Sequence, residues 1–241
     1  MLLHLALVLV LLGLGMAYSA RAGKLTIPAV WTGGGLGLGI YLGADYTGLA
    51  LLALFFGLGT AASAWRVADK RRLGLAEANK GRRTAGQVVA NAGVAGLLGV
   101  LSWHYPAFAP LGQLMLAGSF AAATADTLAS ELGNIYGRRY VNILTLKPDQ
   151  RGLDGVISLE GTLLGLAGSA LLAAVHCLAH HSWHPAFGAL LLGGTVGNLS
   201  DSLLGATLER RGYLPNNAVN FLNTLIGAGT AALGWWAWAA P

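Results

Sequence analysis

Five carboxylate side chains occur inside or at the ends of segments that are otherwise apolar enough to cross a lipid bilayer. They are Asp126, Glu131, Glu160, Asp201 and Glu209. A charged side chain near the bilayer centre costs roughly 2.5 to 3.5 kcal/mol on insertion scales, so carboxylates there usually mark a site that binds or moves something. Carboxylate oxygens without His or Cys suit Mg²⁺ held together with substrate phosphates. These residue types therefore predict chemistry at a membrane.

The composition requires an integral membrane protein. Of the 241 residues, 55% are hydrophobic and only 10% are charged, and the mean hydropathy is +0.60. Segments long enough to span a hydrocarbon core lie at about 1–19, 25–44, 46–65, 87–104, 109–133, 155–178, 185–207 and 219–239. The sequence thus predicts an all-α, polytopic protein with about eight transmembrane helices.

We expect one transmembrane domain over residues 1–241, because every connection is short except those at about 66–86 and 134–154. The first apolar run has no positive charge before it and carries Arg21 and Lys24 just after it. This arrangement favours a retained helix over a cleaved signal peptide.

Glycine is dense within the predicted spans, as at 33–39, 161–165 and 193–197, and the chain has 36 glycines in all. Small residues let transmembrane helices approach closely, so we expect Gly-rich helix packing. A nucleotide-binding GxGxxG interpretation of the first run is weak, because no strand precedes it and it lies in a hydrophobic span.

With eight spans, all 15 Lys and Arg residues fall in connections on one side of the membrane. The positive-inside rule assigns that side to the cytoplasm and places both termini outside, as for an inner or plasma membrane protein. The net charge of +5 then reflects topology rather than a nucleic-acid partner. In the 66–86 connection, Lys80, Arg82 and Arg83 either anchor this topology on anionic lipids or bind phosphates at the mouth of a site.

The predicted topology brings the polar side chains to one depth, near the cytoplasmic surface. Asp126, Glu131, Asp201 and Glu209 lie in the last turns of the fifth and seventh spans, and Asn91, Glu160, Asn220 and Asn223 lie in the first turns of the fourth, sixth and eighth. The outer halves carry almost no such residues. A transporter needs a polar route through both leaflets, whereas an enzyme acting on a lipid-linked substrate needs a pocket at one face, so the pattern favours an enzyme.

Two alternatives to a ligand site remain open at this stage. The carboxylates could form helix-end salt bridges with Arg138, Arg139, Arg210 or Arg211. The asparagines Asn220 and Asn223 could hydrogen-bond between helices rather than to a ligand.

The remaining chemistry-bearing residues give weaker signals. His176 and His180 are four residues apart and could hold a metal, but no carboxylate accompanies them and we expect an interfacial role. The single Cys177 excludes an intramolecular disulfide. The chain has no GxxxxGK(S/T), GxSxG or HExxH pattern and no DGxxAR signature of CDP-alcohol phosphotransferases, so any catalysis must use a different arrangement.

Five segments, in order between residues 79 and 221, resemble the DUF92, or transmembrane protein 19, family. They are NKGRRTAGQVVAN at 79–91, ADTLASELG at 125–133, DGVISLEGT at 154–162, GNLSDSLLGATLE at 197–209 and NNAVNF at 216–221. This family includes the phytyl-phosphate kinase of vitamin E synthesis. The resemblance implies transfer of a phosphoryl group from a nucleoside triphosphate, typically CTP, to an isoprenyl monophosphate, giving the diphosphate.

The resemblance and the residues together suggest the following roles. Asp126, Glu131, Asp201 and Glu209 would hold Mg²⁺ against the nucleotide phosphates, and Lys80, Arg82 and Arg83 would neutralise phosphate charge, with Asp126 and Asp201 central to catalysis. Asn91, Ser130, Glu160, Asn217, Asn220 and Asn223 would bind and orient the substrates. The family commonly has an acidic residue at the place of Asn217, so one candidate ligand is missing here.

The predicted partners are a nucleoside triphosphate, an isoprenyl monophosphate and membrane lipids. The alternatives are a transporter or lipid flippase that uses the carboxylates for ion or proton coupling, and a non-catalytic scaffold.

Overall fold

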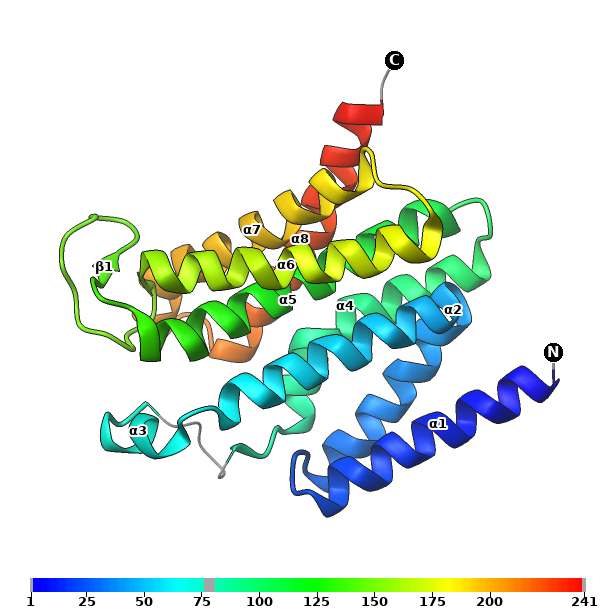
Figure 1. The fold of residues 1–241 in the computed structure, drawn as a ribbon, viewed down its shortest axis with the longest axis horizontal. Helices are drawn as coiled ribbons and strands as arrows, with labels where there is room; N and C mark the ends of the chain where they lie inside the picture. The colour runs from blue at the N-terminus through cyan, green and yellow to red at the C-terminus, as the bar shows by residue number, and fades with distance from the viewer. Residues whose placement is uncertain (1, 76–80, 240–241) are drawn as a thin grey trace.

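The computed structural model describes residues 2–75 and 81–239, and helices form most of it (Figure 1). The long helices are α1 (Leu2–Arg21), α2 (Ile27–Ala64), α4 (Ala85–His104), α5 (Ala109–Tyr136), α6 (Leu159–His180), α7 (Ala186–Leu204) and α8 (Asn216–Ala239). The short elements are helix α3 (Val67–Arg72), the π-helical turn η2 (Gly205–Glu209), and strands β1 (Val141–Asn142) and β2 (Val156–Ile157), which pair antiparallel. The predicted all-α class is confirmed.

The second and third predicted spans are joined in the single helix α2. It bends where Ala44 and Asp45 leave helical backbone angles, with Asp45 at a φ of 48°. Within the described part of the chain, α1, α2, α4 and α6 are long and apolar enough by composition to cross a membrane. Helices α5, α7 and α8 instead carry most of the acidic and asparagine residues of the predicted spans.

Three hydroxyl residues begin helices at one end of the bundle. Thr26 accepts a hydrogen bond from the amide of Ala29 at the start of α2, and Ser158 accepts one from Gly161 at the start of α6. Thr84 and Gln87 form a reciprocal capping box at the start of α4. These caps satisfy amides that a helix start leaves unpaired.

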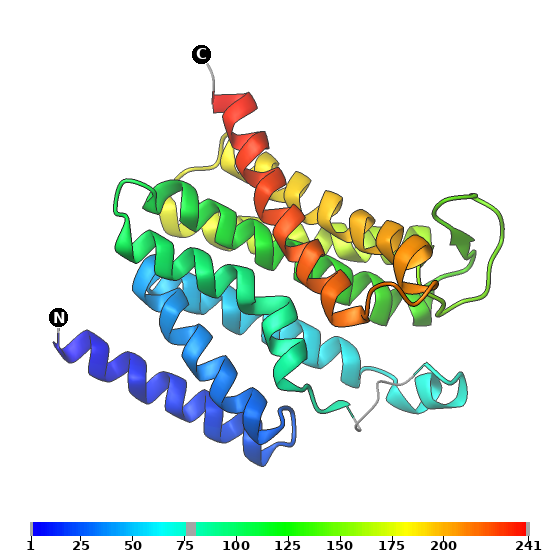
Figure 2. The ribbon, with the colours of Figure 1, turned by 180° about the vertical axis from the view of Figure 1, so that it is seen from behind.

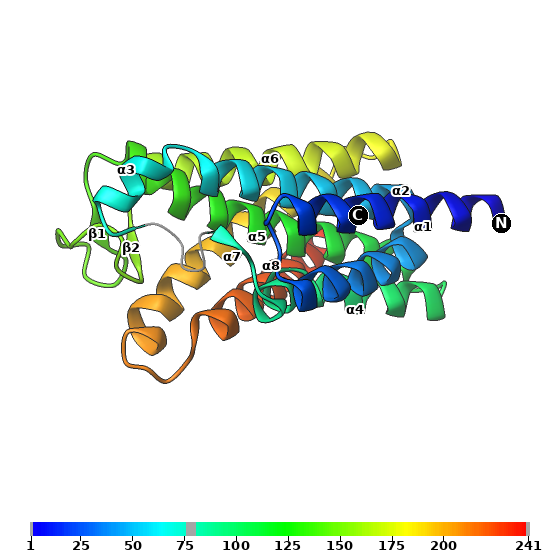
Figure 3. The ribbon, with the colours of Figure 1, turned by 90° about the horizontal axis from the view of Figure 1, so that it is seen from below.

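Helix α5 is the centre of the bundle and packs against α2, α4, α6, α7 and α8. Its middle is a buried stretch rich in alanine, and its Phe120 stacks on Phe55 of α2 at a ring-centroid distance of 5.6 Å. Helix α1 lies at the edge beside α2, as Figure 2 shows from behind. The β1–β2 connection and α3 lie together at one end, which is plain from below in Figure 3.

Glycine allows α2 and α4 to approach to backbone contact. A Cβ added at Gly43 would overlap the carbonyl oxygen of Gly99 and lie 2.7 Å from its Cα. A Cβ at Gly99 would in turn lie 2.8 Å from the Cα of Ile40. The predicted Gly-rich helix packing is therefore confirmed at this crossing, where only a residue without a side chain fits.

We expect Gly43→Ala to destabilise the protein by about 2 kcal/mol or more, because overpacking against backbone forces the two helices apart. Gly35→Ala is the matched control, since a Cβ at Gly35 meets no atom of the described residues within 4 Å. Thermal unfolding in detergent can be followed by reaction of the buried Cys177 with a thiol-specific dye. Equal melting temperatures for the two variants would contradict the close α2–α4 contact.

Candidate functional site

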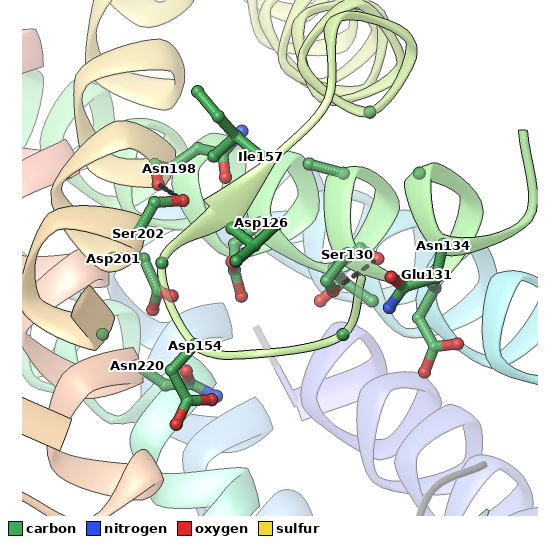
Figure 4. Close-up of a pocket in the computed structure, with 18 of the residues that line it drawn as sticks. Asp126, Ser130, Glu131, Asn134, Asp154, Ile157, Asn198, Asp201, Ser202 and Asn220 are labelled. Atoms are coloured by element: carbon green, nitrogen blue, oxygen red, sulfur yellow. Dashed lines mark hydrogen bonds between the residues drawn. The ribbon is translucent and has the colours of Figure 1, made fainter. Parts of the chain in front are cut away.

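A polar cavity of about 280 Å³ opens between the ends of the central helices and the α5–α6 connection (Figure 4). The lining includes eight residues that the sequence nominated: Arg83, Asn91, Asp126, Ser130, Glu131, Asp201, Glu209 and Asn220. They come from α4 and the segment before it, α5, α7 with η2, and α8. The structure therefore brings together most of the polar groups expected at one depth.

Asp126 of α5 and Asp201 of α7 lie side by side in this cavity (Figure 4). Both are only partly exposed. The Oδ2 atom of Asp201 is buried and has no hydrogen-bond partner among the described residues. Two neighbouring carboxylates repel each other when both are ionised, and a bound cation would remove that repulsion.

Asparagine side chains surround the aspartates. Asn91 donates its amide to the carbonyl of Gln87 at 2.9 Å, and Asn220 lines the cavity. Asn223, one turn further along α8, is fully buried behind the lining. Its side-chain amide lies beside Asp201 but has no hydrogen bond of good geometry to any described residue. Its oxygen packs against Gly197, where an added Cβ would lie only 2.9 Å away.

Glu131 lines the same cavity but is held by a buried cation. It accepts hydrogen bonds from the Nζ of Lys70 and from the hydroxyl of Ser63 at 3.0 Å. The side chain of Lys70 is 2% exposed, and its Nζ also donates to the carbonyl of Ala62 at 2.6 Å. This pair ties α3 and the end of α2 to α5. No sequence signal separated Lys70 from the other basic residues of its connection.

The remaining nominated residues lie outside the cavity lining. Arg82 is exposed, and Asn217 packs beside Gly86 at the start of α4. Glu160 accepts a hydrogen bond from the backbone amide of Arg138 at 3.3 Å and lies 4.0 Å from its guanidinium, as in the salt-bridge alternative. Lys80 falls outside the described residues, so the structure gives no position for it.

The α5–α6 connection adds lining residues that the sequence analysis missed, including Tyr140, Asp154 and Ser158. The carbonyl of Asp154 accepts a hydrogen bond from the Nε of Arg210 at 2.5 Å. Arg210 also pairs with Asp149 at 2.9 Å. The backbone amide of Gln150 and the Arg210 guanidinium hold the pKa of Asp149 below its usual range. The DGVISLEGT segment at 154–162 contains two of these residues, but only its Glu160 was predicted as a site residue.

Gly155 lets this connection lie directly on the end of α7. Its φ is +72°, and a Cβ there would lie 2.6 Å from both the amide of Ala206 and the carbonyl of Ser202. A side chain at this position is therefore excluded by backbone angle and by space.

We expect Gly155→Ala to displace the α5–α6 connection from α7, because the added Cβ overlaps the backbone at the end of that helix. Tryptic cleavage after Arg151 should then increase several-fold. Gly212→Ala is the matched control, because its φ is a similar +73° but no atom in the described part of the chain lies within 4 Å of the added Cβ. Limited proteolysis with mass spectrometry measures the difference. Unchanged cleavage of Gly155→Ala would show that the connection does not depend on this contact.

The four carboxylates predicted as metal ligands share the cavity without forming a ready-made metal cage. Within residues 2–75 and 81–239, no three His, Cys, Asp or Glu side chains gather closely enough to hold an ion by themselves. This limit covers His176 and His180, whose rings lie 4.4 Å apart. A cation at Asp126 and Asp201 would need oxygen atoms from water or from a substrate, as is usual for Mg²⁺.

We expect Glu131→Gln to destabilise the protein by about 3 kcal/mol or more, because it leaves the ammonium of Lys70 buried without its counter-charge. The double variant Lys70→Met with Glu131→Gln should recover at least half of this loss, since neither charge remains. Melting temperatures of the single and double variants provide the measurement. If the double variant is no more stable than Glu131→Gln, the buried pair is not the source of the effect.

Comparison with known proteins shows that the chain is similar to members of one family. Residues 9–228 match the family described as "Integral membrane protein DUF92". The chain is 34% identical to the chloroplastic protein VTE6 of Arabidopsis thaliana over 77% of this chain and 58% of that protein. It thus spans less than two thirds of the length of VTE6.

Two microbial proteins are also similar. Identity is 33% to an uncharacterized membrane protein of Synechocystis over 81% of this chain and 77% of that protein. It is 34% to an uncharacterized membrane protein of Methanocaldococcus jannaschii over 74% and 72%. No solved structure matches. By its match over most of its length, the chain belongs to the DUF92 family of integral membrane proteins.

Proposed function

We propose that this protein is a membrane kinase that transfers a phosphoryl group from a nucleoside triphosphate, with CTP as the expected donor, to an isoprenyl monophosphate such as phytyl phosphate. The observation that carries the proposal is the pair of aspartates, Asp126 and Asp201, in a polar cavity with Arg83 on its wall. Phosphoryl transfer depends mainly on positioning the reactants and stabilising charge. A carboxylate pair and a guanidinium supply the two kinds of group that this requires.

The aspartates suit Mg²⁺. The Oδ2 of Asp201 has no hydrogen-bond partner among the described residues. It and the adjacent carboxylate of Asp126 are hard oxygen donors, and Mg²⁺ is typically bound by one or two carboxylates together with waters and substrate phosphates. When bound, the ion would neutralise charge on the phosphates. Glu209 and Asp154, which line the same cavity, would add negative potential that favours a cation there.

The other residues would hold the reactants. Arg83 presents a planar guanidinium suited to bidentate contact with a phosphate. Asn91 and Asn220 would donate hydrogen bonds to phosphate oxygens, and the connection over α7 would limit the access of water. An acceptor monophosphate is itself an anionic nucleophile, so the proposal needs no general base.

The location of the cavity supports an enzyme over a transporter. Its lining residues lie within about three turns of the helix ends that carry the basic connections. By the positive-inside rule this end would face the cytoplasm, where nucleotides are present. The proposed membrane is accordingly the inner or plasma membrane, with both termini outside.

We expect Asp126→Asn and Asp201→Asn each to lower kcat by roughly 100-fold or more, because each removes charge that positions and stabilises the transferring phosphate. Asp69→Asn should retain activity, since Asp69 of α3 pairs with the preceding Arg66 and lies outside the cavity lining. The assay incubates the purified protein with phytyl or geranylgeranyl monophosphate, Mg²⁺ and each nucleoside triphosphate, and detects the diphosphate. Chelation with EDTA should abolish product, and added Mg²⁺ should restore it.

The kinase proposal fails if no pair of nucleotide and monophosphate gives a diphosphate with the wild-type protein. It also fails if Asp126→Asn and Asp201→Asn retain full activity. Transport by reconstituted wild-type protein that Asp126→Asn abolishes, without any product formation, would instead assign the carboxylates to ion coupling.

A further inference from the structure

A second cavity, of about 570 Å³, lies between α1, α2 and α4. Its walls are mainly apolar, with Leu12 and Met16 from α1, Leu49 and Phe56 from α2, and Val88 from α4 among them. The volume falls within the roughly 300 to 1,000 Å³ typical of sites for small molecules. A ligand that binds in an apolar cavity of this size gains binding free energy mainly by burying hydrocarbon.

The two cavities meet. Four residues line both the polar cavity described above and the apolar one: Phe55, Arg83, Gln87 and Asn91. The wall between a phosphate site and a hydrocarbon site is therefore a single cationic side chain with two amides and one aromatic ring. This junction matches a molecule with an anionic head and a long apolar tail.

Arg83 is held at the junction from both its backbone and its side chain. Its amide donates to the carbonyl of Lys24 at 2.9 Å, and its carbonyl accepts from the amide of Thr26 at 3.0 Å. Its guanidinium lies over the rings of Phe55 and Phe56, at 5.8 and 5.7 Å from their centroids. The charge is thus fixed at the inner end of the apolar cavity.

From the end at Arg83, the apolar cavity extends along α2 toward the bend of this helix. Its lining runs from Phe56 back to Tyr46, which is about 15 Å of helix at the rise of an α-helix. Ala50 and Ala53 on this stretch are exposed and leave space where larger side chains would fill it. Helix α1 forms one wall of this cavity and lies at the edge of the bundle (Figure 1). A tail in the surrounding bilayer can therefore reach the cavity from that side.

We propose that the cavity between α1, α2 and α4 binds the isoprenyl tail of the acceptor, while Arg83 contacts its phosphate at the junction. This inference rests on the proposed kinase function and adds the location of the tail. It assigns acceptor binding to the α1–α2–α4 side and leaves the aspartates of α5 and α7 for the metal and donor phosphates.

The first test needs no turnover. A hexadecyl monophosphate with a diazirine at the far end of its chain is photolysed with the full-length protein in detergent, and adducts are located by mass spectrometry. We expect adducts on the cavity-lining parts of α1 and α2, at 11–19 and 46–53. Geranylgeranyl monophosphate should compete for labelling, and a hexadecanol probe with the same diazirine should label these segments at least five-fold less.

Adducts confined to α6, α7 or α8 would overturn the assignment. So would equal labelling by the hexadecanol probe, which would mark the cavity as a general lipid contact. Since no nucleotide is present, a failure of the kinase proposal would leave specific labelling by the monophosphate intact, and the two failures can be told apart.

The second test fills the cavity. Ala53→Trp should reduce labelling by the hexadecyl monophosphate at least five-fold, and in the kinase assay it should raise KM for geranylgeranyl monophosphate at least ten-fold. The KM for dimethylallyl monophosphate, which has a short tail, should change less than two-fold. Ala61→Trp is the matched control on the same helix, because Ala61 is exposed and lies outside the cavity lining. Equal labelling and equal KM values for the two variants would refute the tail site.

Discussion

The structure depends on placing acidic side chains inside an apolar helical bundle. Asp126 and Asp201 lie in helices α5 and α7, which consist mostly of small and apolar residues such as alanine, glycine and leucine. An isolated charge in such surroundings is costly. The bundle offsets this cost by concentrating polar groups around them, with asparagines from α4 and α8 and a loop laid over α7. Within the described part of the chain, a buried oxygen of Asp201 and the amide of the neighbouring Asn223 have no hydrogen-bond partner of good geometry.

Close packing of helices makes such a concentration possible. At the α2–α4 crossing, backbone meets backbone because Gly43 and Gly99 have no side chains. Gly155 allows the same closeness between the α5–α6 connection and the end of α7. Small residues thus bring several polar helix ends together around one cavity, while α1 lies at the edge of the bundle and lines an apolar cavity beside α2.

The carboxylates have different physical roles, although the sequence presents them alike. Glu131 is neutralised by the buried Lys70 and joins α3 to α5. Glu160 pairs at the surface with Arg138. Asp126 and Asp201 face each other without a basic partner in the described ion pairs, which makes them the better candidates for binding a cation and phosphates.

The sequence alone determined the helical class, the apolar segments and the end of the bundle at which the polar residues gather. These follow from composition, segment length and helical period, which are local properties. It also predicted four of the five acidic residues that line the polar cavity, because acidic groups in apolar spans are rare. Only the tertiary structure decided which carboxylate has a cationic partner, since Lys70 could reach Glu131 only after α3 packed against α5. Three other features likewise depend on contacts between distant segments. They are the joining of two predicted spans in the bent α2, the packing of the α5–α6 connection on α7, and the apolar cavity that meets the polar one at Arg83. No local pattern records such contacts.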